Sequence, residues 1–405
     1  MPKNLVICCD GTNNQFGPEN TNVVRVIQAL VRDPSRQRLY YDPGVGTLPE
    51  PGAWTAIGKK VSTFVGLAFG AGIFWKVQQA YEFLMQEWEP GDKVFVFGFS
   101  RGAYTARLLA AVLHSLGLLP RGNENLIPYV LRLFKGIPHG RSGTAVQEYF
   151  ALCDEFRRTF GRVVPEEPDD RRFHVHCLGL WDTVSSVGWL WDPPSYPYTA
   201  TNPSVDVVWH AISIDERRWL FRQNRIYQAR TDQQLHEEWF PGVHSDVGGG
   251  YPETDGGLWR APFAWILDGT QASGLLVDPG RLAAVLTRTP PPVAACEEPK
   301  HESLTAAWWP AEFLPKLQYR SALGRSVPAI GRGRHRRIAE GASIHACALH
   351  RLRGDRTYRP PNLSRAFVDA VCALSTVPAS LPYATDAVPG ATAAPSGGRG
   401  VSLSV

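Results

Sequence analysis

The residues best suited to chemistry surround Ser100. This serine lies at the centre of GFSRG, which matches the pattern G-x-S-x-G. Gly98 and Gly102 permit the tight strand-to-helix turn that forces such a serine into a strained, exposed position. The apolar run VFVF stands directly before this segment and a helical pattern follows it, which are the surroundings that the turn requires. The sequence therefore predicts that Ser100 is a nucleophile, with a buried serine in an ordinary turn as the alternative.

A nucleophilic serine needs a base, and the base needs an orienting carboxylate, because an isolated hydroxyl is too weakly acidic to attack an ester at neutral pH. Around this serine motif the partners follow in the order Ser, Asp, His. Asp182 ends the strand-like run HVHCLGLWD, and His244 ends the run EEWFPGVH. Both would lie at the carboxyl edge of a parallel sheet, where α/β sheets place their sites. We predict a triad of Ser100, Asp182 and His244, with Asp246 as the rival acid.

The negative charge on an attacked carbonyl oxygen requires N–H donors. The first predicted donor is the backbone N–H of Arg101, directly after the nucleophile, and the second comes from the loop after an earlier strand. That loop begins DGTNN, so Gly11 or Thr12 is the predicted second donor. Asp10 is predicted either to orient this loop by hydrogen bonds or simply to form its turn.

The elements that would position these residues alternate between strands and helices, as a parallel α/β sheet requires. Continuous apolar runs predict buried strands, and apolar residues at helical spacing predict helices. The predicted strands cover residues 5–9, 38–47, 93–100, 173–182 and 235–244, and the predicted helices cover 22–32, 73–88 and 101–117. The expected fold class is α/β: a mainly parallel, α/β-hydrolase-like sheet flanked by helices, with loop or lid insertions.

Composition divides the chain into two parts. Residues 1–377 are predicted to form one α/β-hydrolase-like catalytic domain with insertions, in which the aromatic, proline-rich segment 189–198 suits a lid. Residues 378–405 are mostly Ala, Pro, Gly and Ser with almost no charge. A disordered low-complexity tail is therefore expected there.

The overall composition argues against several classes of protein. The chain has 405 residues, 44% hydrophobic and 20% charged, which is the balance of a globular protein with a large core. A net charge of +4 without zinc-finger spacing argues against a nucleic-acid partner. The N-terminal sequence has no signal-peptide pattern, and the longest uncharged run, 61–75, is too short to span a bilayer. We expect a cytoplasmic location, with export only by a signal-independent route, and the oligomeric state is left open.

The sequence gives less support to a phosphatase or to a metal site. DGT ends the DxDGT motif of haloacid-dehalogenase phosphatases, but the nucleophilic aspartate of that motif would fall on Cys8. His244 and Asp246 form an HxD pair that resembles part of a metal site, but no further ligands join it at a clear spacing. We therefore expect no metal and no cofactor. His210 lies in VDVVWHAISIDERRWLF, which has a helical pattern, and a packing role is predicted for it.

Several longer segments together resemble a known family. CDGTNN, GFSRGAYTAR, GLWDTVSSVG, HAISIDERR, WFPGVHSDVGGGY and IHACALHRLRGDRTYRPPNL are similar to segments of the uncharacterised α/β-hydrolase family whose bacterial members include type VI secretion phospholipase effectors. The resemblance covers residues 5–363. It implies that the elbow serine, the aspartate of WDTV and the histidine before SDVGGGY form the triad. These positions are Ser100, Asp182 and His244, the same three that the residues alone indicate.

Two features of the sequence favour a lipid substrate. Segments 61–75 and 189–198 could bury acyl chains, and residues 320–359, with ten Arg or Lys against two acids, could meet anionic headgroups at a membrane surface. The expected function is a lipase- or phospholipase-like serine hydrolase of carboxylic esters that acts through an acyl-enzyme on Ser100. The alternatives are a soluble esterase or thioesterase and a non-catalytic binding protein that keeps the fold.

Overall fold

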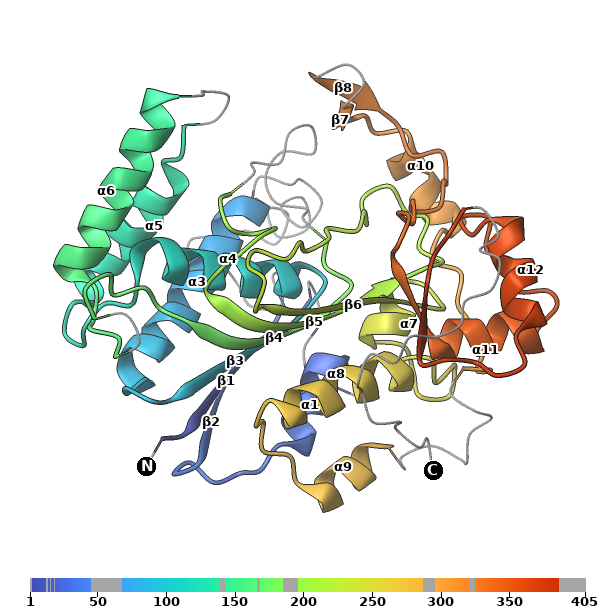
Figure 1. Ribbon diagram of the computed structural model, residues 1–405, viewed down its shortest axis with the longest axis horizontal. Helices are drawn as coiled ribbons and strands as arrows, with labels where there is room; N and C mark the ends of the chain where they lie inside the picture. The colour runs from blue at the N-terminus through green and yellow to red at the C-terminus, as the bar shows by residue number, and fades with distance from the viewer. Residues whose placement is uncertain are drawn as a thin grey trace, which may run out of the picture.

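The computed structural model describes residues 2–11, 14, 16, 17, 19–44, 68–138, 143–165, 168–184, 196–286, 296–320 and 325–385. An eight-stranded sheet runs through it in the order β10-β9-β6-β5-β4-β3-β1-β2 (Figure 1). Neighbouring strands from β2 to β9 pair in parallel, and β10 pairs antiparallel with β9. The strands are β1 (Asn4–Cys9), β2 (Gln37–Asp42), β3 (Lys93–Phe99), β4 (Val175–Trp181), β5 (Val205–Ser213), β6 (Gln234–Phe240), β9 (Ser343–His345) and β10 (Ser380–Pro382). The predicted α/β fold with a mainly parallel sheet is confirmed.

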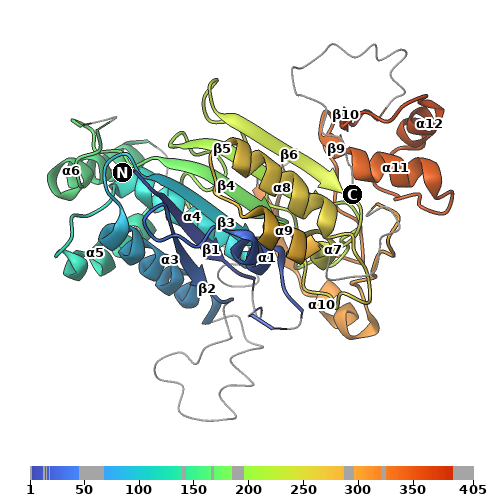
Figure 2. The same ribbon diagram turned by 90° about the horizontal axis from the view of Figure 1, so that it is seen from below.

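Helices cover both faces of the sheet (Figures 1 and 2). One face carries α3 (Ala68–Glu87) and α4 (Arg101–Leu116), with α5 (Ile127–Lys135) and α6 (Thr144–Phe160) packed against α4; the other carries α1 (Asn22–Ala29), α8 (Arg260–Ala272) and α9 (Pro279–Leu286). Because both faces are covered, the central strands β1, β3 and β4 are mainly apolar, and all six residues of β1 are buried. Every residue of α4 after Arg101 is buried, so the sheet fixes this helix firmly.

The carboxyl-terminal part adds a smaller layer at one edge of the sheet. β9 and β10 pack with α11 (Ala346–Gly354) and α12 (Arg365–Ala373) around a separate apolar core that includes Ile344, Leu349 and Phe367. The remaining short elements are η1 (Glu124–Leu126), α7 (His244–Gly248), η2 (Ala306–Trp308), α10 (Trp309–Glu312), β7 (Lys316–Arg320) and β8 (Arg325–Ala329). In Figure 1, α10 and the β7–β8 hairpin project away from the sheet.

Two sequence predictions differ from this structure. The stretch around His210 forms β5 and not a helix, because most of its residues are buried, and a strand buried on both faces lacks the alternation that identifies strands. The predicted tail 378–405 begins too early, because Ser380–Pro382 pairs with β9 in the sheet. Residues 386–405 lie outside the described residues, as do 61–67 and 189–195 of the predicted acyl-binding segments. In the part of the chain that the structure describes, no helix is long and apolar enough to cross a membrane.

The strand order creates a point where the chain reverses its direction across the sheet. From β1 the chain moves outward to β2, returns past β1 to β3, and then continues the other way to β4. Such a reversal leaves a crevice beyond the carboxyl ends of the two central strands, where α/β sheets bind their ligands. Asp10 follows β1 and Ser100 follows β3, so both stand at this crevice.

Candidate active site

The turn that holds Ser100 joins the end of β3 to the start of α4. Ser100 has a φ of 60° and a ψ of −123°, a conformation that costs a residue with a side chain about 1–3 kcal/mol. A Cβ on Gly98 would lie 2.5 Å from the Cα of Ala103, and a Cβ on Gly102 would lie 2.2 Å from the carbonyl oxygen of Cys9. Both positions therefore require glycine, so that β3 can turn into α4 close to the end of β1.

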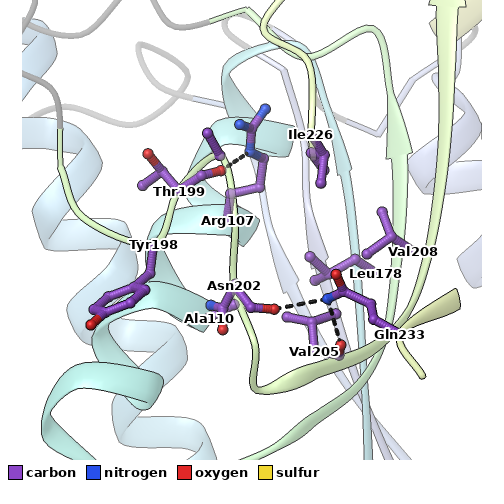
Figure 3. A pocket seen from close by; sticks show the side chains of 11 residues that line it. Arg107, Ala110, Leu178, Tyr198, Thr199, Asn202, Val205, Val208, Ile226 and Gln233 are labelled. Carbon is purple, nitrogen blue, oxygen red and sulfur yellow. Dashed lines mark hydrogen bonds between the residues drawn. The ribbon is translucent and has the colours of Figure 1, made fainter. Parts of the chain in front are cut away.

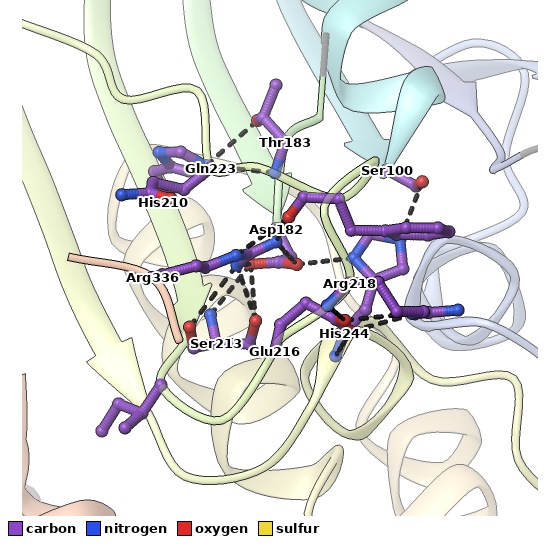
Figure 4. A network of polar contacts seen from close by, with 12 residues as sticks. Ser100, Asp182, Thr183, His210, Ser213, Glu216, Arg218, Gln223, His244 and Arg336 are labelled. Carbon is purple, nitrogen blue, oxygen red and sulfur yellow. Dashed lines mark hydrogen bonds and ion pairs between the residues drawn. The ribbon is translucent and has the colours of Figure 1, made fainter. Parts of the chain in front are cut away.

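Ser100, His244 and Asp182 form one hydrogen-bonded row (Figure 4). Oγ of Ser100 lies 2.8 Å from Nε2 of His244, and Nδ1 of His244 lies 2.5 Å from Oδ2 of Asp182. A carboxylate can only accept, so Nδ1 carries the hydrogen and Nε2 is left to accept from the serine hydroxyl. His244 begins α7, just beyond the end of β6, and Asp182 directly follows β4. The carboxyl edge of the sheet thus brings together the three side chains that the sequence selects.

The carboxylate of Asp182 is surrounded by donors. Its Oδ1 accepts from the backbone N–H and the hydroxyl of Ser213 at 2.9 and 3.1 Å. The guanidinium of Arg336 contacts both carboxylate oxygens, at 2.5 and 2.9 Å. Burial disfavours the charged form, but the Arg336 cation and the hydrogen bond from His244 outweigh this effect and lower the pKa of Asp182. The carboxylate is therefore ionised at neutral pH, as the orientation of a histidine requires.

Arg336 is a site residue that sequence reasoning missed. It lies in the basic stretch 320–359, whose charges the sequence analysis relates to lipid headgroups, yet its side chain is only 4% exposed. It also donates to the hydroxyl of Ser213 and to the carbonyl oxygen of Phe221. No motif or spacing separates Arg336 from the other arginines of this stretch, so the sequence contains no signal for its role.

Aromatic rings enclose the imidazole of His244. Its ring centre lies 4.6 Å from that of Phe99 and 4.9 Å from that of Phe221, which meets it edge-on. Burial lowers the pKa of His244 and outweighs the opposite effect of Asp182. The imidazole is therefore neutral at pH 7 and able to accept a proton from Ser100.

Glu216 fixes the loop that faces His244. Its buried carboxylate accepts from the backbone N–H groups of Arg217, Arg218 and His244 at 3.0, 2.8 and 3.2 Å. It also pairs with the guanidinium of Arg218 at 2.9 Å, and that guanidinium lies 3.6 Å over the ring of Phe221. Burial opposes ionisation, but the Arg218 contacts outweigh it and lower the pKa of Glu216 to about 2. The segment HAISIDERR contains this pair, but its spacing does not reveal what the carboxylate bonds to.

Two of the three predicted oxyanion donors are described. Arg101 is the first residue of α4, so its backbone N–H directly follows Ser100. Gly11 also lies beside the serine, because a Cβ at Gly11 would be 3.3 Å from the Cβ of Ser100. The N–H of Gly11 donates to Oδ1 of Asp10 at 2.7 Å, however, and is engaged in this structure. Thr12 lies outside the described residues.

Asp10 holds the loop that follows β1. In addition to the Gly11 contact, its Oδ2 accepts from the hydroxyls of Thr21 and Tyr41, each at 3.0 Å. Burial raises the pKa of Asp10 to about 6. These contacts fit the orienting role predicted for Asp10 better than a simple turn.

Asp246, the rival acid, has other partners than the ring of His244. Its Oδ2 accepts from the backbone N–H groups of Val243 and His301 at 2.9 and 3.1 Å, and its Oδ1 lies 2.6 Å from Nδ1 of His301. Asp246 therefore shapes the start of α7 and joins it to the segment around His301, and its carboxylate bonds to these groups instead of the ring of His244, which pairs with Asp182. Within the described ranges, no group of three or more His, Cys, Asp or Glu residues could hold a metal ion.

A small internal cavity lies apart from this row, between α4 and the strands β4 and β5 (Figure 3). Its volume is about 10 Å³, and Arg107, Leu178 and Val208 are among its lining residues. Arg107 donates to the carbonyl oxygens of Thr199 and Asn224 at 2.6 and 2.7 Å. The space suits about one water molecule. It is too small for an acyl chain.

The fold and the site together define an α/β protein with a serine-type candidate active site at the carboxyl edge of a parallel sheet. Residues 3–269 match the family described as T6SS, phospholipase effector Tle1-like, catalytic domain. The chain belongs to this family, which confirms the resemblance that its motifs show. Ser100, Asp182 and His244 all lie inside the matched range, whereas Arg336 lies outside it.

Individual relatives match the chain over part of their length. The uncharacterized protein YEL023C of Saccharomyces cerevisiae is 34% identical over 228 residues, which are 55% of this chain and 32% of that protein. The solved structure of an uncharacterized protein from Pseudomonas aeruginosa has 18% identity and a TM-score of 0.39, covering 69% of this chain and 47% of that chain. The structure of the Tle1 effector bound to the VgrG spike of the type 6 secretion system has 20% identity and a TM-score of 0.37, covering 64% and 52%. The chain thus spans about a third of the yeast relative and about half of each solved structure.

Proposed function

We propose that this protein hydrolyses carboxylic esters of lipids or phospholipids through an acyl-enzyme on Ser100. The observation that carries the proposal is the hydrogen-bonded row from Ser100 through His244 to the ionised carboxylate of Asp182. Membership in the Tle1-like phospholipase effector family supports an acyl ester of a phospholipid as the substrate.

The geometry supports a two-step reaction. In the first step, Oγ of Ser100 attacks the ester carbonyl carbon while Nε2 of His244 takes the hydroxyl proton. The tetrahedral intermediate then expels the alcohol, whose oxygen receives that proton from His244, and an acyl-enzyme remains. In the second step, His244 takes a proton from water as the water oxygen attacks the acyl carbon. Collapse of this second intermediate releases the carboxylic acid and returns the proton to Ser100.

The surrounding groups have separate roles in this scheme. The backbone N–H of Arg101 and a second donor from the loop after β1 stabilise the oxyanion. Gly11 can be that second donor only if its bond to Asp10 opens, so Thr12 stays the other candidate. Asp182 holds the imidazole in the required tautomer, and Arg336 is a positioning residue behind Asp182.

The central test is the substitution Ser100→Ala. It is expected to abolish turnover of a short p-nitrophenyl ester and labelling by a fluorophosphonate probe, while the circular dichroism spectrum is unchanged. Ser115→Ala is a matched control, because Ser115 is buried like Ser100 but lies inside α4, where its hydroxyl donates to the helix backbone. Activity that survives in Ser100→Ala would overturn the proposal. A folded wild-type protein that the probe fails to label would favour a non-catalytic binding protein.

A soluble esterase or thioesterase is the alternative within the same chemistry. Rates on phospholipid vesicles are to be compared with rates on short soluble esters and thioesters. A higher kcat/KM on vesicles supports the lipid substrate. Turnover restricted to the soluble compounds would assign the protein to the alternative class.

A further inference from the structure

The segment 305–314, TAAWWPAEFL, has an unusual distribution of polar and apolar side chains. Glu312 is its single charged residue, and this carboxylate is buried, accepting from the backbone N–H groups of Trp219 and Gly333 at 2.5 and 2.8 Å. The large apolar side chains face outward: Trp309, Phe313 and Leu314 are 39%, 59% and 38% exposed. Three large apolar groups exposed within six residues are typical of a surface that meets a partner.

The chain that follows is strongly basic. Residues 313–339 contain seven Arg or Lys and no Asp or Glu. Arg336 turns inward to Asp182, whereas Arg332, Arg334 and Arg337 are exposed. Within the described residues, no ion pair joins any of these three side chains to a carboxylate. Their charges are therefore available to an anionic partner.

The exposed apolar groups and the exposed arginines belong to one surface. The backbone N–H of Gly331 donates to the carbonyl oxygen of Glu312 at 2.9 Å, and a Cβ on Gly333 would lie 3.2 Å from the ring of Trp309. These contacts hold the arginine segment against α10. We call this surface the rim surface, and it consists of Trp309, Phe313, Leu314, Arg332, Arg334 and Arg337.

The rim surface adjoins the candidate active site on two sides. Trp308, just before α10, meets the ring of Phe221 edge-on at 5.5 Å between ring centres, and Phe221 meets His244 at 4.9 Å. On the other side, Arg336 lies between Arg334 and Arg337 in the sequence, and its guanidinium donates to Asp182 at 2.9 Å. A body that docks on the rim surface would therefore lie next to the row of Ser100.

We propose that the rim surface docks the protein on an anionic lipid bilayer. Trp309, Phe313 and Leu314 enter the interfacial layer, and the three arginines bind anionic headgroups. Outward aromatic and aliphatic side chains beside arginines that form no ion pair with a described carboxylate are a combination that favours interfacial membrane binding. This inference rests on the proposed lipid hydrolysis and names the surface through which the site reaches its substrate.

The test measures co-sedimentation with vesicles, using the Ser100→Ala protein so that the lipid stays intact. Vesicles of phosphatidylcholine alone are compared with vesicles that also contain phosphatidylglycerol. The triple variant Arg332→Glu, Arg334→Glu, Arg337→Glu is expected to weaken binding to the anionic vesicles by on the order of a hundredfold. The double variant Phe313→Asp, Leu314→Asp is expected to weaken binding to the same vesicles by at least about tenfold.

Two control variants make the same kinds of substitution at exposed positions away from the rim surface. The control for the arginines is the triple variant Arg353→Glu, Arg356→Glu, Arg365→Glu, which changes exposed arginines around α11 and α12. The control for the apolar side chains is the double variant Phe160→Asp, Val163→Asp, which changes exposed residues at the end of α6. Both controls are expected to bind within about fivefold of the parent, because screening limits distant charges. The inference is overturned if the parent fails to bind anionic vesicles, if the rim variants bind as the parent does, or if the controls lose as much.

Activity separates this inference from the proposed function. With Ser100 present, the rim variants are expected to hydrolyse a short soluble ester at the parent rate and phospholipid vesicles more slowly. Esterase activity that persists in Ser100→Ala would defeat the proposed function. The vesicle-binding result would still decide whether the rim surface docks on a bilayer.

Discussion

Two regions of the chain meet at the site, and they differ in whether their charged side chains near it are buried or exposed. The region that matches the family, residues 3–269, supplies the strands β1 to β6 and the whole row of Ser100, His244 and Asp182. Its charges at the site are buried and bonded to partners. The region from 296 to 385 supplies the guanidinium of Arg336 to the site, and Arg332, Arg334 and Arg337 beside it are exposed.

This difference shows that burial, and not residue type, decides what an arginine does here. Arg336 is enclosed by Asp182 and Ser213, whereas Arg337, the next residue, faces outward. Removal of one partner of a buried ion pair leaves an unpaired buried charge, at a cost of about 3–5 kcal/mol. The first region thus depends on the second for the charge balance of its orienting carboxylate.

Among the variants that compare the two regions, the largest effect is expected from Asp182→Asn, which tests the family-matched region. The amide can hold the imidazole in the wrong tautomer and leaves Arg336 without its counter-charge, so kcat on a soluble ester is expected to fall by about 10⁴-fold. The matched control is Asp246→Asn, which is expected to lower kcat by less than about tenfold, since Asp246 bonds to Val243 and His301. A larger loss of kcat in Asp246→Asn than in Asp182→Asn would contradict the role of Asp182 as the partner of His244.

The next effect tests the second region through Arg336→Gln. Removal of the cation leaves Asp182 buried and unpaired, so the free energy of unfolding is expected to fall by about 3–5 kcal/mol, with kcat lower by on the order of a hundredfold. The control is Arg337→Gln, whose exposed side chain should change stability by no more than about 0.5 kcal/mol. Chemical denaturation and steady-state kinetics measure both.

The pH profile shows whether Arg336 positions the row or only stabilises the fold. Burial lowers the pKa of His244, so the acid limb of kcat/KM in the wild type is expected below the ordinary histidine value of about 6.5. Without Arg336, the negative charge of Asp182 stabilises the imidazolium more strongly, and the acid limb should move to higher pH. Should a more stable variant be needed, Arg336→Lys keeps the charge and is expected to keep the wild-type limb. An unchanged limb in Arg336→Gln would leave Arg336 with a structural role alone.

The smallest effect is expected from Glu216→Gln, which removes another buried carboxylate of the family-matched region. The pKa of Glu216 is lowered to about 2 in the folded protein, so its charge stabilises the fold above its ordinary pKa near 4.5. That contribution is lost as the pH falls from about 4.5 toward 2. The unfolding temperature of the variant should therefore lie below that of the wild type at pH 7 and approach it in acid. A gap that widens in acid would contradict this assignment.

The sequence by itself determined the fold class and the three residues of the row. Ser100, Asp182 and His244 each stand near the end of an apolar strand pattern, and parallel strands bring their carboxyl ends to one edge of the sheet. The glycines Gly98 and Gly102 are likewise local requirements of the turn. Such features are visible in a sequence because each depends on neighbouring residues.

Only the tertiary structure decided which charges enter the site. Arg336 meets Asp182 across 154 positions of chain, and Glu216 accepts from the backbone N–H of His244 only when α7 lies beside β5. The sequence pattern also failed to predict strand β5, because burial on both faces removes the alternation of polar and apolar residues that identifies a strand. The reason is common to all three: the surroundings of a side chain are set by segments far away in sequence, and no local spacing records which segments those are.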